Sequence, residues 1–416
     1  MQWQISKNST TKVPGLIFIC YLERYNLEMS NQTNAFNPNF SGAFWLRWLL
    51  IVLCLFLAAI VLRAAVPPRP IELGPQQTVL TTNPKMGVHT RLTDEVEPWK
   101  VKRTLEMVRQ MGAPWIVEYF PWAYREPLPG FFDWSHSDLV INHANRQGLK
   151  VIARLGFVPE WARPTDSASS FLPPERRADF ADYVQAFVNR YGDRIAAVII
   201  WNEPNLALEW GFQPIDPEGY TELLKLSYQQ VQASNYPNVP VLGGALAPTL
   251  APPGSDQAMN DLIYLQRMLD AGAGEAMDGL AAHAYGWSFP ADDPPQPDLI
   301  NFRRTELLRQ MLVDNGYPHM PIYITEGGWN DHPRWTRAVK PAQRIEYTIQ
   351  AYELVESWPW AKTAALWAFR YPWPARTYLD YFTFVTPEFD PKPIYFEIQR
   401  YSRGEVSESS SDVNHK

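Results

Sequence analysis

Beyond residue 85, short apolar runs alternate with longer stretches whose apolar positions recur at helical spacing. Eight of the runs predict β-strands, and several are continuously apolar, as expected when both faces of a strand are covered. The predicted strands are Met86–His89, Trp115–Tyr119, Lys150–Leu155, Ala196–Trp201, Val239–Gly244, Gly279–His283, Pro321–Thr325 and Thr363–Trp367. This alternation predicts an α/β protein in which strands and helices follow one another in regular succession.

A predicted helix follows each strand. The predicted helices are Glu95–Met111, Ser135–Gln147, Arg176–Tyr191, Pro217–Ser234, Asp256–Ala271, Asp298–Asn315, Pro341–Ser357 and Pro393–Tyr401. Eight such units in about 320 residues match a (β/α)8 TIM barrel. A doubly wound open sheet is the structural alternative, but residues 90–99 after the first strand lack the glycine-rich phosphate loop that such sheets carry.

An uninterrupted apolar run precedes this pattern. It extends from Trp48 to Leu62 between Arg47 and Arg63, and with its flanks it approaches the roughly 20 residues that cross a bilayer. We therefore predict an N-terminal transmembrane helix that anchors the protein in a membrane, with the following domain on the extracytoplasmic side. Secretion after cleavage of a signal peptide is the alternative, although a cleavage site near Ala64 lacks the small residue that cleavage requires.

These features divide the chain into five segments. Residues 1–43 are expected to form a polar tail, 44–66 the anchor or signal segment, and 67–84 a proline-rich linker. The barrel domain is expected at 85–403, followed by a disordered C-terminal tail at 404–416.

Composition narrows the classes of function. The formal net charge is -7 and no basic stripe is visible, so no nucleic-acid partner is expected. Cys20 and Cys54 both precede the domain, which excludes a disulfide framework, a cysteine-rich zinc module and a thiol nucleophile from it. The chain contains 17 Trp, whose flat rings suit both a packed core and the C–H faces of sugars.

Two predicted strands lead directly into a carboxylate. The fourth is followed by Glu203 in the sequence WNEPN, and the seventh by Glu326 in the sequence ITEGGWN. In a barrel, catalytic groups lie at the C-terminal ends of strands, and strands four and seven lie on roughly opposite sides of the mouth. The two glutamates are therefore expected to face each other across a cleft. Glycoside hydrolysis requires such a pair, one acid for the leaving oxygen and one base or nucleophile.

The WNEPN and ITEGGWN motifs resemble the two signatures of the retaining clan-A glycoside hydrolases. The resemblance extends from about Gly87 to Tyr401 and includes supporting stretches at 126–134, 149–162 and 391–395. It is nearest to the β-xylosidase and α-L-iduronidase group and looser to the family-five cellulases. It implies a (β/α)8 barrel and an O-glycosyl hydrolase that acts on β-linked glycosides or polysaccharides by double displacement. It implies no metal and no organic cofactor, and no ligand cluster in the sequence suggests one.

The resemblance also implies roles for individual residues. Glu203 matches the acid/base and Glu326 the nucleophile. Asn202 matches the residue that hydrogen-bonds the 2-hydroxyl of the reacting sugar.

Further candidates for sugar contacts lie at other strand ends. His283 and Tyr285 match residues that support the nucleophile, and Trp367 matches the ring that forms the floor beneath the reacting sugar. His89, at the end of the first strand, and Trp329, within the second motif, are additional candidates.

One position departs from the clan pattern. The clan usually places an arginine near the end of strand two to support the nucleophile, but residues 115–119 contain none. Arg154 on strand three is a possible substitute. Glu118 adds a carboxylate near the mouth, which is expected either to repel Glu326 or to bind a sugar hydroxyl.

Two readings therefore stand side by side. The first is a membrane-anchored retaining glycosidase. The second is a non-catalytic carbohydrate-binding protein of the cell surface, built on a degenerate glycosidase barrel. The absent arginine favours the second reading, and the intact glutamate pair favours the first. Both have a carbohydrate as their partner.

Overall fold

The computed structural model describes residues 42–65 and 73–405. The chain divides into two compact units, Met1–Ile71 and Glu72–Lys416. In the first unit, helix α1 (Gly42–Ala65) covers the apolar run. Among the described residues, no helix has both the length and the apolar character needed to cross a membrane, so the predicted transmembrane anchor at 44–66 is not supported. The predicted tails fall almost entirely on 1–41 and 406–416, outside the described residues.

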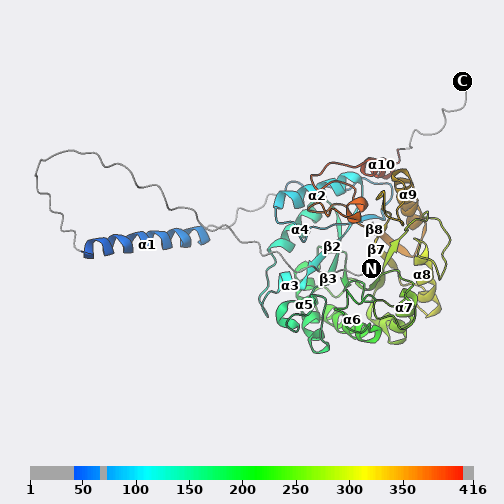
Figure 1. Cartoon of the computed structure of the whole chain (residues 1–416), viewed down its shortest axis with the longest axis horizontal. Helices are drawn as coiled ribbons and strands as arrows, with labels where there is room; N and C mark the ends of the chain where they lie inside the picture. Colours follow the sequence, from blue (N-terminus) through cyan, green and yellow to red (C-terminus); the bar gives the residue numbers. More distant parts are fainter. Residues whose placement is uncertain (1–41, 66–72, 406–416) are drawn as a thin grey trace, which may run out of the picture. The chain divides into compact units, whose positions relative to one another are not determined.

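The second unit is a closed barrel of eight parallel strands in chain order, which confirms the predicted α/β barrel. All eight predicted strands are present, with ends that differ by a few residues. They are β1 (Met86–His89), β2 (Trp115–Pro121), β3 (Lys150–Gly156), β4 (Ala197–Ile200), β5 (Val241–Leu246), β6 (Gly279–Tyr285), β7 (Ile322–Gly328) and β8 (Ala361–Leu366). In Figure 1 the helices form a ring around these strands.

The barrel closes because β1 pairs with both β2 and β8, so that Val88 lies opposite Ile116 on one side and Leu366 on the other. A small apolar cluster of strand residues, which includes Ile152, Ile199 and Leu242, is separate from the larger core that includes the helices. Layers of inward-pointing side chains of this kind make a TIM barrel a packed core rather than a pore. Apolar packing on both faces explains why the strands are continuous apolar runs in the sequence.

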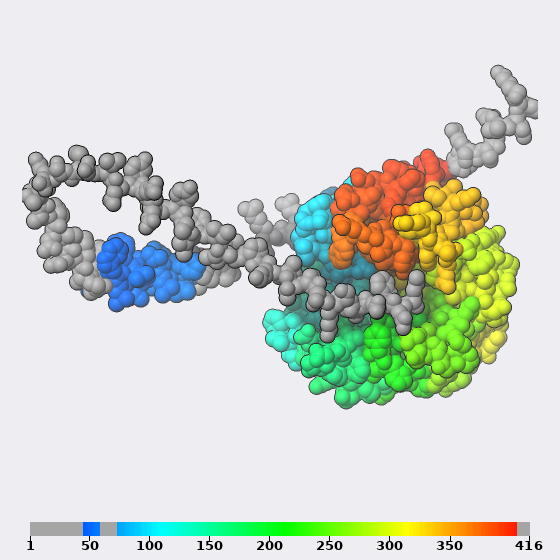
Figure 2. All heavy atoms as spheres, viewed as in Figure 1, coloured from blue at the N-terminus to red at the C-terminus, as the bar shows by residue number. Residues whose placement is uncertain are grey.

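The predicted helices are also present, and a short additional helix follows β2. The helices are α2 (Pro98–Met111), α3 (Trp122–Arg125), α4 (Ser135–Arg146), α5 (Arg177–Tyr191), α6 (Pro217–Gln232), α7 (Asp261–Asp270), α8 (Arg304–Asp314), α9 (Pro341–Ser357) and α10 (Pro393–Ser402). Successive units follow one another around the domain, as the colours of Figure 2 show. Gly112, directly after α2, has φ 92°, in the left-handed region that favours glycine and commonly ends helices.

Three boundaries differ from the expectation by more than a few residues. Helix α8 begins at Arg304 rather than 298, after a turn in which the Asn301 side chain accepts from the N–H of Arg304 at 2.9 Å. Helix α7 begins at Asp261 rather than 256, because the Asn260 side chain caps it by accepting from the N–H of Leu262 at 3.0 Å. The domain also begins before residue 85. The N–H groups of Gln77 and Thr82 donate to the carbonyls of Arg146 and Ser402, so part of the expected linker packs on the barrel.

We predict that a shortened chain beginning at Glu72 folds on its own, because the unit from Glu72 onward contains all eight strands and their core. Its melting temperature should lie within about 2 °C of that of the full chain, measured by circular dichroism. Aggregation of the shortened chain, or a clearly lower melting temperature, would show that the domain needs residues 1–71.

Candidate active site

Glu203 lies in a constrained turn directly after β4. Trp201 and Glu203 have φ values of 74° and 40°, and Ala245 at the end of β5 has 50°, a region that residues other than glycine rarely adopt. The N–H of Glu203 donates to the carbonyl of Ala245 at 3.0 Å. The side chain of Asn205 bonds both the N–H and the carbonyl of Ala247. The WNEPN turn is thus tied to β5, which holds Glu203 at the mouth of the barrel.

Glu326 lies near the end of β7, and its side chain is only 9% exposed. Arg154, on β3, forms a buried ion pair with one carboxylate oxygen of Glu326. The hydroxyl of Tyr285 donates to the other oxygen at 3.0 Å. Arg154 is therefore the positively charged partner of Glu326. It takes the place of the strand-two arginine that the sequence lacks.

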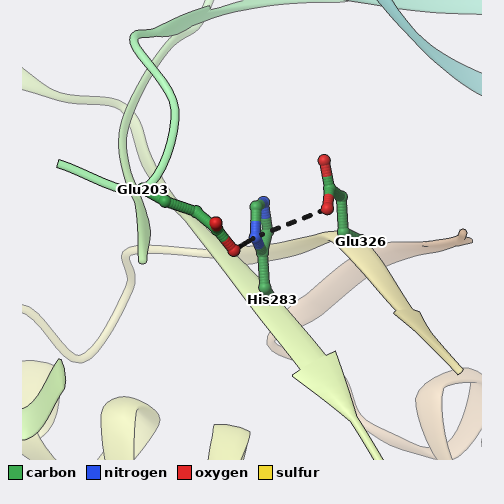
Figure 3. Close-up of side chains that lie close together, drawn as sticks. All are labelled: Glu203, His283 and Glu326. Atoms are coloured by element: carbon green, nitrogen blue, oxygen red, sulfur yellow. Dashed lines mark hydrogen bonds and ion pairs between the residues drawn. The ribbon is translucent and has the colours of Figure 1, made fainter. Parts of the chain in front are cut away.

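His283 lies between the two glutamates, as Figure 3 shows. Its Nδ1 is 2.7 Å from Oε1 of Glu203 and 3.7 Å from Oε2 of Glu326. The register of the sheet places His283 beside Glu326, because His283 on β6 is paired directly with Glu326 on β7. His283 thus contacts the Glu203 carboxylate more closely than that of Glu326, although the resemblance assigned it to the latter.

The electrostatic surroundings favour an ionised Glu326. Burial by itself raises the pKa of this carboxyl, but the neighbouring charges of His283 and Arg154 outweigh burial and hold the pKa below its ordinary value. Burial likewise lowers the pKa of His283, and the charges of Glu326 and Glu203 reverse this, so that the net shift is upward. The site therefore combines a carboxylate that stays ionised at low pH with a histidine that readily holds a proton beside Glu203.

Asn202 is oriented by the same guanidinium. Its Oδ1 accepts a hydrogen bond from Arg154 at 2.7 Å. Because a guanidinium only donates, the amide oxygen must face Arg154, and the amide N–H groups remain on the opposite side. Asn202 also lines a cavity of about 370 Å³ at the barrel mouth, within the size range of small-molecule sites.

His89 and Trp367 line the same cavity from β1 and from the end of β8. Their rings lie 4.6 Å apart, and the indole N–H of Trp367 donates to the hydroxyl of Tyr371 at 2.9 Å. Nε2 of His89 lies 3.7 Å from Oε1 of Glu326. The structure thus brings together seven of the eight predicted site residues.

The exception is Trp329. Its side chain is buried away from the cavity, where it packs against Phe302 and Tyr347, and its indole N–H donates to the carbonyl of Phe289 at 2.7 Å. The prediction that Trp329 contacts sugar is therefore not supported. A tryptophan that follows a strand fills the space beneath a loop as readily as it lines a cleft.

Glu118 was expected either to repel Glu326 or to bind a sugar hydroxyl, and the structure supports neither role. Its carboxylate is fully buried and accepts hydrogen bonds from Thr90, Leu92 and Thr93. These bonds hold the loop between β1 and α2. Glu118 therefore has a structural role. Its carboxylate oxygens already accept hydrogen bonds from this loop, so they are not available to a sugar.

Sequence reasoning missed Glu209, a partly buried carboxylate that lines the cavity six residues after Glu203. Burial raises its pKa, and the negative charge of Glu203 raises it further. In the sequence it stands between Leu208 and Trp210 without any motif, so only the path of the turn after β4 reveals that it faces the site.

The cluster of Glu203, His283 and Glu326 also has the donor types of a metal site. One ligand atom from each residue lies within 4.8 Å of the others, and carboxylate and imidazole are both zinc ligands. The guanidinium of Arg154 contacts Glu326, however, and a cation in this position would be repelled by it. The arrangement therefore suits carboxylate chemistry better than metal coordination.

Comparisons with known proteins identify the fold. No family model matches the sequence, and no curated protein matches it. Among solved structures, the chain is similar to a family 39 glycoside hydrolase from the gut symbiont Bacteroides cellulosilyticus WH2, with TM-score 0.61 and 22% identity, and it spans 63% of that enzyme's length. That alignment covers 77% of this chain.

Two further structures give the same result. A monomeric β-xylosidase from Caulobacter crescentus CB15 matches with TM-score 0.56 and 19% identity over 78% of this chain and 69% of its own. The GH39 enzyme from Xanthomonas axonopodis pv. citri matches with TM-score 0.57 and 16% identity over 79% of this chain and 67% of its own. The chain therefore has the barrel fold of these clan-A glycosidases.

We predict that replacing Arg154 by Met raises the pKa of Glu326 by at least about one unit, because an adjacent cation lowers a carboxyl pKa by about 1–3 units. Fewer Glu326 carboxyls would then stay ionised as the pH falls. Titration of ¹³C-labelled glutamate by NMR measures this shift. Arg176→Met, at an exposed surface position, is the control and should leave the titration unchanged. An unaltered Glu326 titration in Arg154→Met would contradict the electrostatic role of Arg154.

Proposed function

We propose that this protein is a retaining glycoside hydrolase that cleaves β-linked glycosides by double displacement. Glu326 is the nucleophile and Glu203 the acid/base. The likeness of the fold to family 39 enzymes supports the class of reaction. The printed names of two neighbours, a β-xylosidase and a β-glycosidase, support the β-linkage.

The observation that carries the proposal is the spacing of the two carboxylates. Oxygen atoms of Glu203 and Glu326 lie within 4.8 Å of each other. Retaining enzymes hold their carboxyl groups about 5–5.5 Å apart, whereas inverting enzymes need about 6.5–9.5 Å to admit a water molecule beside the sugar. The spacing in this cavity favours direct attack by a carboxylate.

In the first step, an oxygen of Glu326 attacks the anomeric carbon while the bond to the leaving oxygen breaks and Glu203 gives that oxygen a proton. The hydrogen bond between Glu203 and His283 keeps the Glu203 carboxyl oriented for this proton transfer. In the second step, Glu203 takes a proton from water, which attacks the anomeric carbon and releases Glu326. The two inversions give net retention.

The surrounding residues assist both steps. The Arg154 ion pair keeps Glu326 ionised before attack. The amide nitrogen of Asn202 faces away from Arg154. One of its N–H groups hydrogen-bonds Glu209, and the other can donate to the 2-hydroxyl, a hydrogen bond that strengthens in the transition state. Trp367 offers its ring as a floor for the sugar.

A non-catalytic carbohydrate-binding protein is the second candidate. Its support was the missing arginine of strand two. Arg154 supplies a charge partner for Glu326 from β3 instead, and that support is thereby removed. A panel of nitrophenyl β-glycosides, compared with Glu326→Ala, distinguishes the two: binding without any turnover would favour the second candidate.

The sequence also supports a proposal on location, namely that the domain acts outside the cytoplasm. The apolar run from Trp48 to Leu62 suits either a retained segment or a cleaved signal. Cell fractionation combined with N-terminal sequencing of the mature protein tests the proposal, and a full-length protein in the cytoplasmic fraction would contradict it.

The two glutamates should respond differently to substitution. Glu203→Ala should strongly slow hydrolysis of natural glycosides but spare the first step on nitrophenyl substrates, because an acidic phenol leaves without a proton donor. Azide needs no general base, so it should restore turnover and give a β-glycosyl azide. Product analysis by NMR and chromatography measures this.

Glu326→Ala should lose at least about 10³-fold in kcat on both types of substrate, because each requires the nucleophile. Azide should then give the α-glycosyl azide. Glu353→Ala, at an exposed position on α9, is the control and should behave like the unaltered enzyme. Equal losses in both variants on both substrates, with the same azide anomer or none, would show that the roles are assigned wrongly.

A further inference from the structure

Of the carboxylates that line the cavity beside Glu203 and Glu326, Asp94 is paired with Arg91 and Glu118 is bonded by the loop after β1, which leaves Glu209 to be explained. Glu209 lines the cavity together with Tyr119, Arg154 and Asn202. Within the parts of the chain that the structure describes, no ion pair is formed by Glu209. The side chain of Asn202 hydrogen-bonds Glu209. A carboxylate has about four acceptor positions, so this partly buried group keeps lone pairs that can accept hydrogen bonds from a ligand in the cavity.

The positive charges of the cavity are already matched. Two guanidiniums line it: Arg154 is paired with Glu326, and Arg91 is paired with Asp94 at 2.8 Å. The lining carries three carboxylates, those of Asp94, Glu118 and Glu209. The cavity therefore has an excess of negative charge, which disfavours an anionic ligand.

A second acceptor faces the same space. Nδ1 of His89 lies 2.6 Å from the carbonyl oxygen of Thr90. Because a carbonyl only accepts, Nδ1 carries the hydrogen, and Nε2 of the neutral ring has a lone pair. The side chain is 1% exposed, and Nε2 has no hydrogen-bond partner among residues 42–65 and 73–405. Burial holds the pKa of His89 well below its ordinary value, which keeps the ring neutral.

An unpaired buried acceptor is costly unless a ligand satisfies it. His89 and Glu209 together therefore suit a ligand that brings hydrogen-bond donors and no negative charge. A sugar with free hydroxyl groups fulfils this, whereas the carboxylate of an acidic sugar brings further acceptors and a charge of the wrong sign.

We propose that Glu209 is a specificity-determining residue, which accepts hydrogen bonds from the hydroxyl groups of the bound sugar and discriminates by charge against acidic sugars. This inference rests on the proposed function for its identification of the ligand as a sugar. It predicts that the protein binds a cationic amino sugar or a neutral sugar more tightly than a uronic acid.

The test compares three sugars of similar shape and different charge. Nitrophenyl β-glycosides of glucosamine, glucose and glucuronic acid are assayed with the unaltered protein, with Glu209→Gln and with the surface control Glu353→Gln. Binding of the three free sugars is measured in parallel by calorimetry at pH 6, a readout that does not depend on turnover.

The unaltered protein and Glu353→Gln should prefer glucosamine and glucose over glucuronic acid by at least about tenfold. Glu209→Gln should shrink that preference about tenfold, by lowering kcat/KM for the glucosaminide relative to the glucoside and raising it for the glucuronide. A substitution that merely loosened the fold would weaken all three substrates alike. Such a uniform loss, or an unaltered protein that accepts glucuronide as well as glucoside, would overturn the inference.

The calorimetric binding measurements distinguish a failure of this inference from a failure of the proposed function. If the order of sugar binding changes in Glu209→Gln as expected but nothing is hydrolysed, the inference holds and the proposed function fails. If hydrolysis occurs and the order is the same in both proteins, the proposed function holds and the inference fails. Absence of binding and of turnover for every sugar would overturn both.

Discussion

The ion pair between Arg154 and Glu326 is the interaction on which the rest of the site depends. Both side chains are about nine-tenths buried, and an unpaired charge in such a position is strongly unfavourable, so removing one partner of a buried pair costs about 3–5 kcal/mol. The two residues come from β3 and β7, on different sides of the mouth. Only the closed barrel brings them together. Arg154 acts with His283 to keep Glu326 ionised, and its hydrogen bond to Asn202 sets the direction of an amide donor.

Charge balance also explains the arrangement around this pair. His283 lies between the carboxyl groups of Glu203 and Glu326, and its positive charge, with that of Arg154, helps to keep Glu326 ionised. The left-handed backbone at Glu203 is sustained by the bonds that tie its turn to β5. Strain of this kind persists only where the surroundings over-determine it, and here the surroundings are the neighbouring strand and the tightly paired site.

The barrel could be predicted from the sequence, because strands covered on both faces leave continuous apolar runs. The glutamate pair could also be predicted, because Glu203 and Glu326 each follow such a run directly. The charge partner on β3 could only be suggested, since nothing in the sequence tells which way Arg154 points. Trp329 was misplaced because an indole next to a motif packs in a core as readily as in a cleft. Glu209 was missed because its position depends on the tertiary path of a turn, for which periodicity carries no information. The start of α7 was wrong because the side-chain cap at Asn260 competes with helical periodicity.

The central claim is that Glu326 attacks the sugar directly. Trapping the glycosyl-enzyme with a 2-deoxy-2-fluoro β-glycoside that carries a good leaving group, followed by peptide mass spectrometry, tests this most directly. The fluorine slows both steps, and the good leaving group speeds up only the first, so the intermediate accumulates. The account predicts one sugar attached to the peptide that contains Glu326 and none in Glu326→Ala. A label on a different residue, or an active enzyme that releases the opposite anomer and forms no adduct, would contradict it.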